Sequence, residues 1–199
     1  MEKQPSTRPA LLVIDLQRWF LEVGSKEKLA SVARLIEKTN ELIAFFSQMK
    51  LPIIKIQTVH KADKSTWNQW ALANDIGRLI EGSYEAEYSP AVLSAEGEVL
   101  LTKTRVSAFI RTDLEAQLHR LDCNQVVIVG YSTNSCVGQT AIAAYEYDFE
   151  VLLAGEAILG TNQQEGQLML DYLEKRYGML PMDNSAIKLD IEKRNLRKY

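Results

Sequence analysis

The sequence has only two cysteines, two histidines and no long uninterrupted hydrophobic segment. Cys123 and Cys136 are too few for a disulfide framework, so we expect both thiols to be reduced, as in a cytoplasmic protein. The apolar run ALLVI at residues 10–14 is far too short to span a bilayer, and the residues before it lack the pattern of a signal peptide. We therefore predict a cytoplasmic location and no membrane partner.

The sequence also lacks a strong excess of charge of either sign. Lys and Arg total 23 against 26 Asp and Glu, which gives a net charge of −3. This balance provides no general attraction to nucleic acid, so no nucleic-acid partner is expected. Repeats, low-complexity tracts and Gly/Ser-rich linkers are missing too. With 199 residues, 46% of them hydrophobic, the chain predicts a single domain over residues 1–199.

Short apolar segments alternate with helical patterns along the chain. Strands are predicted at residues 9–17, 52–60, 97–104, 125–132, 150–159 and 186–189. Helices are predicted at residues 29–46, 112–121 and 165–178, with a further helix beginning near Cys136. Alternation of this kind favours parallel βαβ units. We predict a three-layer αβα fold of the α/β class, with a doubly wound, mostly parallel sheet of about six strands.

Chemically reactive side chains follow three of these strands. Asp15 ends the first predicted strand, Lys103 ends the third, and Cys136 lies just past the fourth. Each has an ordinary explanation when taken singly: a turn cap, a surface lysine and a small buried hydrophobic residue. Ligands of parallel sheets bind beyond the carboxyl ends of the strands, where these three side chains would meet. Together they predict a catalytic site.

An acid, a cation and a thiol form a coherent set for acyl transfer. A free thiol has a pKa of about 8.5, so little thiolate exists at neutral pH. We expect a helix N-terminus and Lys103 to lower the pKa of Cys136. Asp15 would take the thiol proton and later donate it to a leaving amine. Backbone amides of the turn GYSTNSC would bind the oxyanion of a tetrahedral intermediate.

Four segments in this order resemble the isochorismatase-like hydrolase superfamily, and specifically its cysteine amidohydrolase branch. The segments are LLVIDLQRWF, LTKTRVSAFIRTDLEAQL, VVIVGYSTNSCVGQTAIAAY and VLLAGEA. The resemblance implies a catalytic triad of Asp15, Lys103 and Cys136. It further implies a cis peptide bond between Tyr131 and Ser132, with the amides of Ser132 and Cys136 as oxyanion donors. It also suggests a homo-oligomer.

Departures from the superfamily's subgroups narrow the expected chemistry. Nicotinamidases carry an Asp-x-His metal motif after the second strand, where this chain has Thr58, Val59 and His60. The other histidine, His119, falls on a predicted solvent-facing helix, so we expect no catalytic metal and no other cofactor. Siderophore-type isochorismatases cleave a vinyl ether and have no cysteine at the position of Cys136.

We therefore predict a cysteine-dependent hydrolase that cleaves a C–N bond in a small amide or carbamoyl compound. A vinyl-ether hydrolase using Asp15 and Lys103, or a nicotinamidase, is the alternative. The irregular region 61–96 would form either a lid or a subunit interface. Substrate-pocket candidates, each of which has core packing or a local hydrogen bond as its alternative, are Phe20, His60, Trp67, Phe109 and Tyr131.

Overall fold

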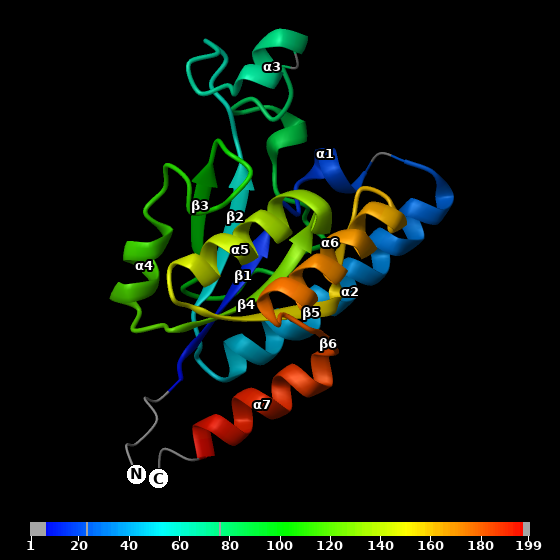
Figure 1. Ribbon diagram of the computed structural model, residues 1–199. Helices are drawn as coiled ribbons and strands as arrows, with labels where there is room; N and C mark the ends of the chain where they lie inside the picture. The colour runs from blue at the N-terminus through cyan, green and yellow to red at the C-terminus, as the bar shows by residue number, and fades with distance from the viewer. Residues whose placement is uncertain (1–6, 23, 76, 197–199) are drawn as a thin grey trace.

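The computed structural model describes residues 7–22, 24–75 and 77–196, and a six-stranded parallel sheet forms its centre (Figure 1). The strands run in the spatial order β3-β2-β1-β4-β5-β6, and every neighbouring pair is parallel. Their bounds are β1 Pro9–Ile14, β2 Ile53–Thr58, β3 Val99–Lys103, β4 Gln125–Tyr131, β5 Glu150–Leu159 and β6 Pro181–Met182. The predicted doubly wound sheet is confirmed.

Helices cover both faces of the sheet and complete three layers (Figure 1). One face carries α4 (Leu114–Arg120), α5 (Gly138–Glu146) and α6 (Gln163–Tyr177), and the other carries α2 (Lys26–Gln48) and α7 (Asn184–Leu196). Buried side chains alternate along β1, so Leu12 and Ile14 join the first core while Leu11 and Val13 join the second. A strand apolar on both faces is what a sheet covered on both sides requires.

Helix α2 begins and ends where its sequence dictates. The Ser25 hydroxyl accepts a hydrogen bond from the Lys28 amide, which satisfies one of the unpaired donors of the first turn. Its buried residues recur at helical spacing and pack against the sheet. The helix ends at Gln48, before Pro52, because proline disfavours helical geometry in the residue that precedes it.

The prediction of a last strand at residues 186–189 is wrong. These residues lie inside α7, and the final strand is the two-residue β6 just before it. The Asp183 carboxylate accepts a hydrogen bond from the Ala186 amide and so caps the helix. Ile187 and Ile191, one helical turn apart, are both buried against the sheet. Four residues are too few for hydrophobic periodicity to separate a strand from a helix.

The region 61–96 rises in a lobe above the carboxyl ends of β2 and β3 and then returns to pack on the body of the protein, where Val92 joins the second core (Figure 1). It contains the short helix α3 (Gln69–Asn74) and a 3-10 turn at Tyr84–Ala86. The short helix α1 (Arg18–Leu21) follows β1 and contacts this 3-10 turn. Within the described residues, no helix is both long enough and apolar enough to cross a membrane.

The strand order places a switch point between β1 and β4. From β1 the chain moves outward to β2 and β3, then returns to β4 and moves the other way to β5 and β6. The loops that leave β1 and β4 therefore diverge, and a crevice opens between them at the carboxyl ends of the strands. Asp15 follows β1 directly, and Cys136 lies in the turn after β4.

Candidate active site

Asp15, Lys103 and Cys136 converge at this switch point. The Lys103 ammonium lies 2.9 Å from the Asp15 carboxylate and donates to the Cys136 sulfur at 3.3 Å. The Asp15 carboxylate also acts on the thiol and helps to raise the pKa of Cys136. Neither Asp15 nor Lys103 has a solvent-exposed side chain. Three groups that are 88 and 33 residues apart along the chain thus form one compact cluster, as the strand-end argument predicted.

Thr58 and Gln17 hold this cluster in place, and sequence reasoning assigned neither of them to it. The Thr58 hydroxyl donates to Asp15 at 2.9 Å and accepts from Lys103 at 2.7 Å. The Gln17 amide group donates to the carbonyls of Thr58 and Ala86, and its oxygen accepts from the Thr58 amide. Thr58 is the polar last residue of β2 and Gln17 follows β1 by three residues, so a polar side chain at a strand end was the signal available in the sequence.

Burial of an ion pair and a thiol together sets the protonation of the cluster. Burial alone would lower the pKa of Lys103, but the Asp15 and Cys136 contacts outweigh it and raise that pKa. Burial and the Asp15 charge raise the pKa of Cys136 to about 12, against the opposing effect of Lys103. The resting cluster is therefore an Asp15–Lys103 ion pair beside a protonated thiol.

The expectation that Cys136 has a depressed pKa is wrong for this resting site. Cys136 lies within a π-helical turn, Thr133–Val137, that precedes α5, and it faces a carboxylate as well as an ammonium. Desolvation of the thiolate and repulsion by Asp15 exceed the attraction of Lys103.

Thiol alkylation tests this protonation state. At pH 7, iodoacetamide should modify Cys136 more slowly in the folded protein than in the protein unfolded in urea. The reason is that the raised pKa keeps the folded thiol protonated until well above pH 8.5. Asp15→Asn should accelerate the reaction, since it removes a charge that disfavours the thiolate. The measurement is mass spectrometry of the Cys136 peptide against pH. Rapid modification of the wild-type protein at pH 6 would contradict the assignment.

The turn after β4 has the geometry expected from the family resemblance. The peptide bond between Tyr131 and Ser132 is cis. The Ser132 carbonyl accepts hydrogen bonds from the amides of Ser135 and Val137, the residues on either side of Cys136. The turn is therefore compact, and it holds the amides of Ser132 and Cys136 on the same short loop as the thiol.

Asn134 ties this turn to the loop between β5 and α6. Its side-chain amide donates to the Thr161 hydroxyl and to the Glu165 carboxylate, both at 2.7 Å. Its oxygen accepts from the Thr161 amide at 3.0 Å, and Thr161 also donates to Glu165. Four mutually supporting hydrogen bonds thus fix the residue two positions before the nucleophile candidate.

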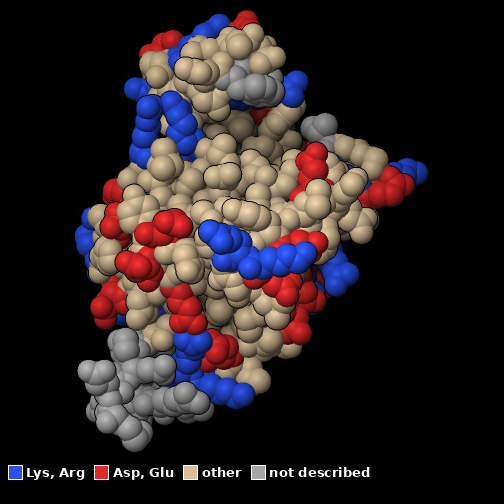
Figure 2. Space-filling model, in the orientation of Figure 1, with Lys and Arg blue, Asp and Glu red and all other residues tan. Residues whose placement is uncertain are grey.

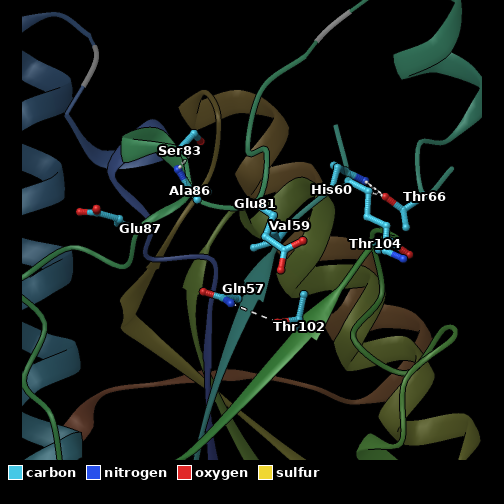
Figure 3. A pocket seen from close by; sticks show the side chains of 12 residues that line it. Gln57, Val59, His60, Thr66, Glu81, Ser83, Ala86, Glu87, Thr102 and Thr104 are labelled. Carbon is cyan, nitrogen blue, oxygen red and sulfur yellow. Dashed lines mark hydrogen bonds between the residues drawn. The ribbon is translucent and has the colours of Figure 1, made fainter. Parts of the chain in front are cut away.

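His60 lines a cavity next to the cluster (Figure 3). The cavity has a volume of about 490 Å³, and Gln57 and Thr102 share a hydrogen bond at its floor. Because side chains alternate along a strand, these two point away from the face that carries Thr58 and Lys103. The cavity thus lies behind the cluster, across β2 and β3.

The His60 ring stands near Thr66 at the rim of this cavity. Its Nδ1 atom lies 3.5 Å from the Thr66 hydroxyl. Burial, together with the charges of Arg105 and Lys103, lowers the pKa of His60, so the imidazole is neutral at neutral pH. The two roles considered for His60, lining a pocket and making a local hydrogen-bond contact, coexist in the structure.

The remaining pocket candidates lie in three different places. Phe20 and Tyr131 pack together beside the β4 turn, with ring centroids 5.4 Å apart. Trp67 is buried inside the 61–96 lobe, where its indole N–H donates to the Lys61 carbonyl. Phe109 is buried in the core and stacks on Tyr147. Phe20 and Tyr131 are therefore the two of these four that the structure brings to the turn carrying Cys136.

The metal motif of the nicotinamidase subgroup does not fit these residues. Thr58 occupies the position of its acid, and the hydroxyl is already engaged by Asp15 and Lys103. His119 is exposed on α4. Among residues 7–22, 24–75 and 77–196, no group of three or more His, Cys, Asp or Glu side chains could hold a metal ion.

A doubly wound αβα sheet with an acid, a lysine and a cysteine at its switch point defines the structural class. Comparison with known proteins then identifies the family. The model of the isochorismatase domain matches residues 9–182. Maleamate amidohydrolase from Pseudomonas putida is 27% identical over 175 residues, which cover 86% of this chain and 81% of that protein.

Solved structures share the fold. An isochorismatase family protein from Desulfovibrio vulgaris superposes with a TM-score of 0.84 at 21% identity, covering 94% of this chain and 99% of that one. N-carbamoylsarcosine amidase from Thermoplasma acidophilum superposes with a TM-score of 0.76 at 20% identity, covering 89% and 96%. The chain belongs to the isochorismatase family of hydrolases, a family with amidase members, and the resemblance seen in its motifs is confirmed.

Proposed function

We propose that this protein is a cysteine-dependent hydrolase that cleaves a C–N bond in a small amide or carbamoyl compound through a thioester. The observation that carries the proposal is the position of the Lys103 ammonium, 2.9 Å from Asp15 and 3.3 Å from the Cys136 sulfur. A nucleophile, a proton acceptor and a cation within contact distance are what nucleophilic catalysis needs. Relatives named maleamate amidohydrolase and N-carbamoylsarcosine amidase support a C–N bond as the target.

In the first half of the reaction the Cys136 sulfur bonds to the carbonyl carbon as its proton passes to the Asp15 carboxylate. Lys103 stabilises the sulfur while it carries negative charge. The carbonyl oxygen becomes an oxyanion, to which the amides of Ser132 and Cys136 donate. When this intermediate collapses, the C–N bond breaks, and Asp15 returns its proton to the leaving nitrogen.

In the second half water attacks the thioester carbon. Asp15 takes a proton from the water, the C–S bond breaks, and the sulfur recovers that proton from Asp15. The products are the acid and ammonia or an amine, and the site returns to its resting ion pair and thiol. A cytoplasmic location and a homo-oligomeric state remain predictions beside this mechanism.

Trapping of the thioester tests the proposal. We expect one or more compounds from a panel of small amides, ureido acids, carbamoyl compounds and nicotinamide to release ammonia. Added hydroxylamine should divert the acyl group to a hydroxamate, because a thioester reacts with amine nucleophiles. Acid-quenched protein should carry the acyl mass on the Cys136 peptide and not on the Cys123 peptide. Hydrolysis of a vinyl ether with no ammonia from any amide would favour the isochorismatase-type alternative, which uses Asp15 and Lys103 alone.

A further inference from the structure

Arg105 is a half-buried cation without an acidic partner in the described part of the chain. Two other partly buried arginines of this structure are each paired with two carboxylates: Arg18 with Glu22 and Glu87, and Arg194 with Glu150 and Asp190. No described Asp or Glu lies within ion-pair distance of Arg105. Because withdrawing a charge from water is costly unless a counter-charge meets it, this guanidinium is suited to an anion supplied from outside.

Backbone carbonyls hold the Arg105 guanidinium by one of its nitrogens. The Nη1 atom donates to the Thr66 carbonyl at 2.8 Å and to the Thr104 carbonyl at 2.7 Å. A guanidinium carries five N–H donors in a rigid plane, so the three on Nε and Nη2 are left. No described group of the chain accepts from these three. The Nε and Nη2 donors form the side-on edge that binds a carboxylate through two parallel hydrogen bonds.

This fixed guanidinium belongs to the residue next to the catalytic cluster. The Lys103 ammonium that contacts the Cys136 sulfur also donates to the Arg105 carbonyl at 3.1 Å. Asp15 neutralises the charge of Lys103, whereas the charge of Arg105 stays uncompensated. Lys and Arg side chains also border the neck between the α3 lobe and the body of the protein (Figure 2). The uncompensated charge of Arg105 therefore favours a negatively charged group beside it.

The acidic residue that shares this region does not neutralise Arg105. Glu81 lines the cavity that Thr66 and Thr104 also line, yet it makes no ion pair with Arg105. The His60 imidazole, which lines the same cavity, is neutral at neutral pH and adds no charge of its own. Lys61 also lines this cavity but is exposed to solvent, whereas Arg105 is a half-buried cation beside it that keeps a free donor edge.

We propose that Arg105 is a specificity-determining residue that binds a free carboxylate on the substrate. The substrate class is then a small carboxylic acid that carries a second group, an amide or a carbamoyl group, whose carbonyl carbon reaches Cys136. This inference rests on the proposed amide hydrolysis and adds to it the chemical identity of the part of the substrate that does not react.

Two probes that differ in one group test the inference. Succinamate carries a carboxylate beside its amide, and succinamide replaces that carboxylate with a second, neutral amide. We expect the wild-type protein to prefer succinamate. In Arg105→Gln, the ratio of kcat/KM for succinamate to that for succinamide should fall by about 10- to 100-fold, the range for hydrogen bonds to a charged group. The loss should appear mainly in KM. The ratio for Arg105→Lys should lie between those of the wild type and Arg105→Gln, because lysine keeps the positive charge but lacks the planar guanidinium group.

A matched control and a binding measurement separate the possible failures. Arg111→Gln removes an exposed arginine six residues away and should leave the ratio unchanged. Equal losses for both probes in Arg105→Gln, or no wild-type preference for succinamate, would overturn the role of Arg105 and leave amide hydrolysis intact. If neither probe is hydrolysed, calorimetry can still measure the binding of succinamate. The two proteins compared are Cys136→Ala and the double variant Cys136→Ala/Arg105→Gln. At least tenfold weaker binding supports the inference, and equal or undetectable binding in both proteins overturns it.

Discussion

Replacing Cys136 with alanine should lower kcat/KM for amide hydrolysis by about 10⁴-fold or more, while replacing Cys123 should leave kcat/KM unchanged. The first change removes the atom that forms the thioester, and no other thiol contacts Lys103 in the described part of the chain. Losses of this size follow removal of the nucleophile in comparable catalytic triads. The measurement is ammonia release under single-turnover and steady-state conditions.

Cys123 is a suitable control because it is a thiol of the same chain that lies in the core and not in the cluster with Asp15 and Lys103. It is buried in the core, and burial raises its pKa to about 11. Its alanine variant tests whether loss of a buried thiol by itself affects turnover through packing. Retained turnover in Cys136→Ala would refute the thioester mechanism and leave Asp15 and Lys103 as the chemistry of an isochorismatase-type hydrolase.

Gly130→Ala should lower the free energy of unfolding by about 3–5 kcal/mol and abolish activity. Gly130 has φ +124°, a conformation that residues with a side chain rarely adopt. A Cβ atom there would lie 2.1 Å from the backbone oxygen of Ile14, on the neighbouring strand. Relief of this clash must move β1 or β4, and with them Asp15 or the Tyr131–Ser132 peptide. Urea denaturation and ammonia release measure the two effects.

Gly97→Ala separates the two causes. Gly97 also has a positive φ, +75°, but a Cβ atom there would meet nothing within 4 Å. This variant should cost only the backbone term, about 1–2 kcal/mol. Equal destabilisation of the two variants would show that the contact with Ile14 has no part in the loss.

The strand ends were readable from sequence because the relevant signals are local. Continuous apolar runs bounded by polar residues located β1 to β5, and the position of a residue just after such a run placed Asp15, Lys103 and Cys136 at one edge of the sheet. Short segments were less informative. Residues 186–189 were misread as a strand because their helical partners, Asp183 and Ile191, lie outside the four-residue pattern.

Protonation and specificity depend on neighbours that are distant in sequence. The pKa of Cys136 is raised because Asp15 and burial outweigh Lys103, and this balance requires the distances within the folded cluster. The sequence predicts Phe109 as a pocket residue or a core residue, and its stacking on Tyr147, at the end of α5, shows that it lies in the core.

By itself, the sequence determined the αβα fold class and the family. It also determined that an acid, a lysine and a cysteine lie at the ends of strands. Periodicity, strand-end position and motif order are properties of residues that are close in sequence, so they can be read from the sequence alone. Only the tertiary structure decided that Thr58 and Gln17 support the cluster, that the resting thiol is protonated, and that Arg105 keeps a free donor edge. Each of these follows from electrostatics and hydrogen bonds between segments that folding alone brings together.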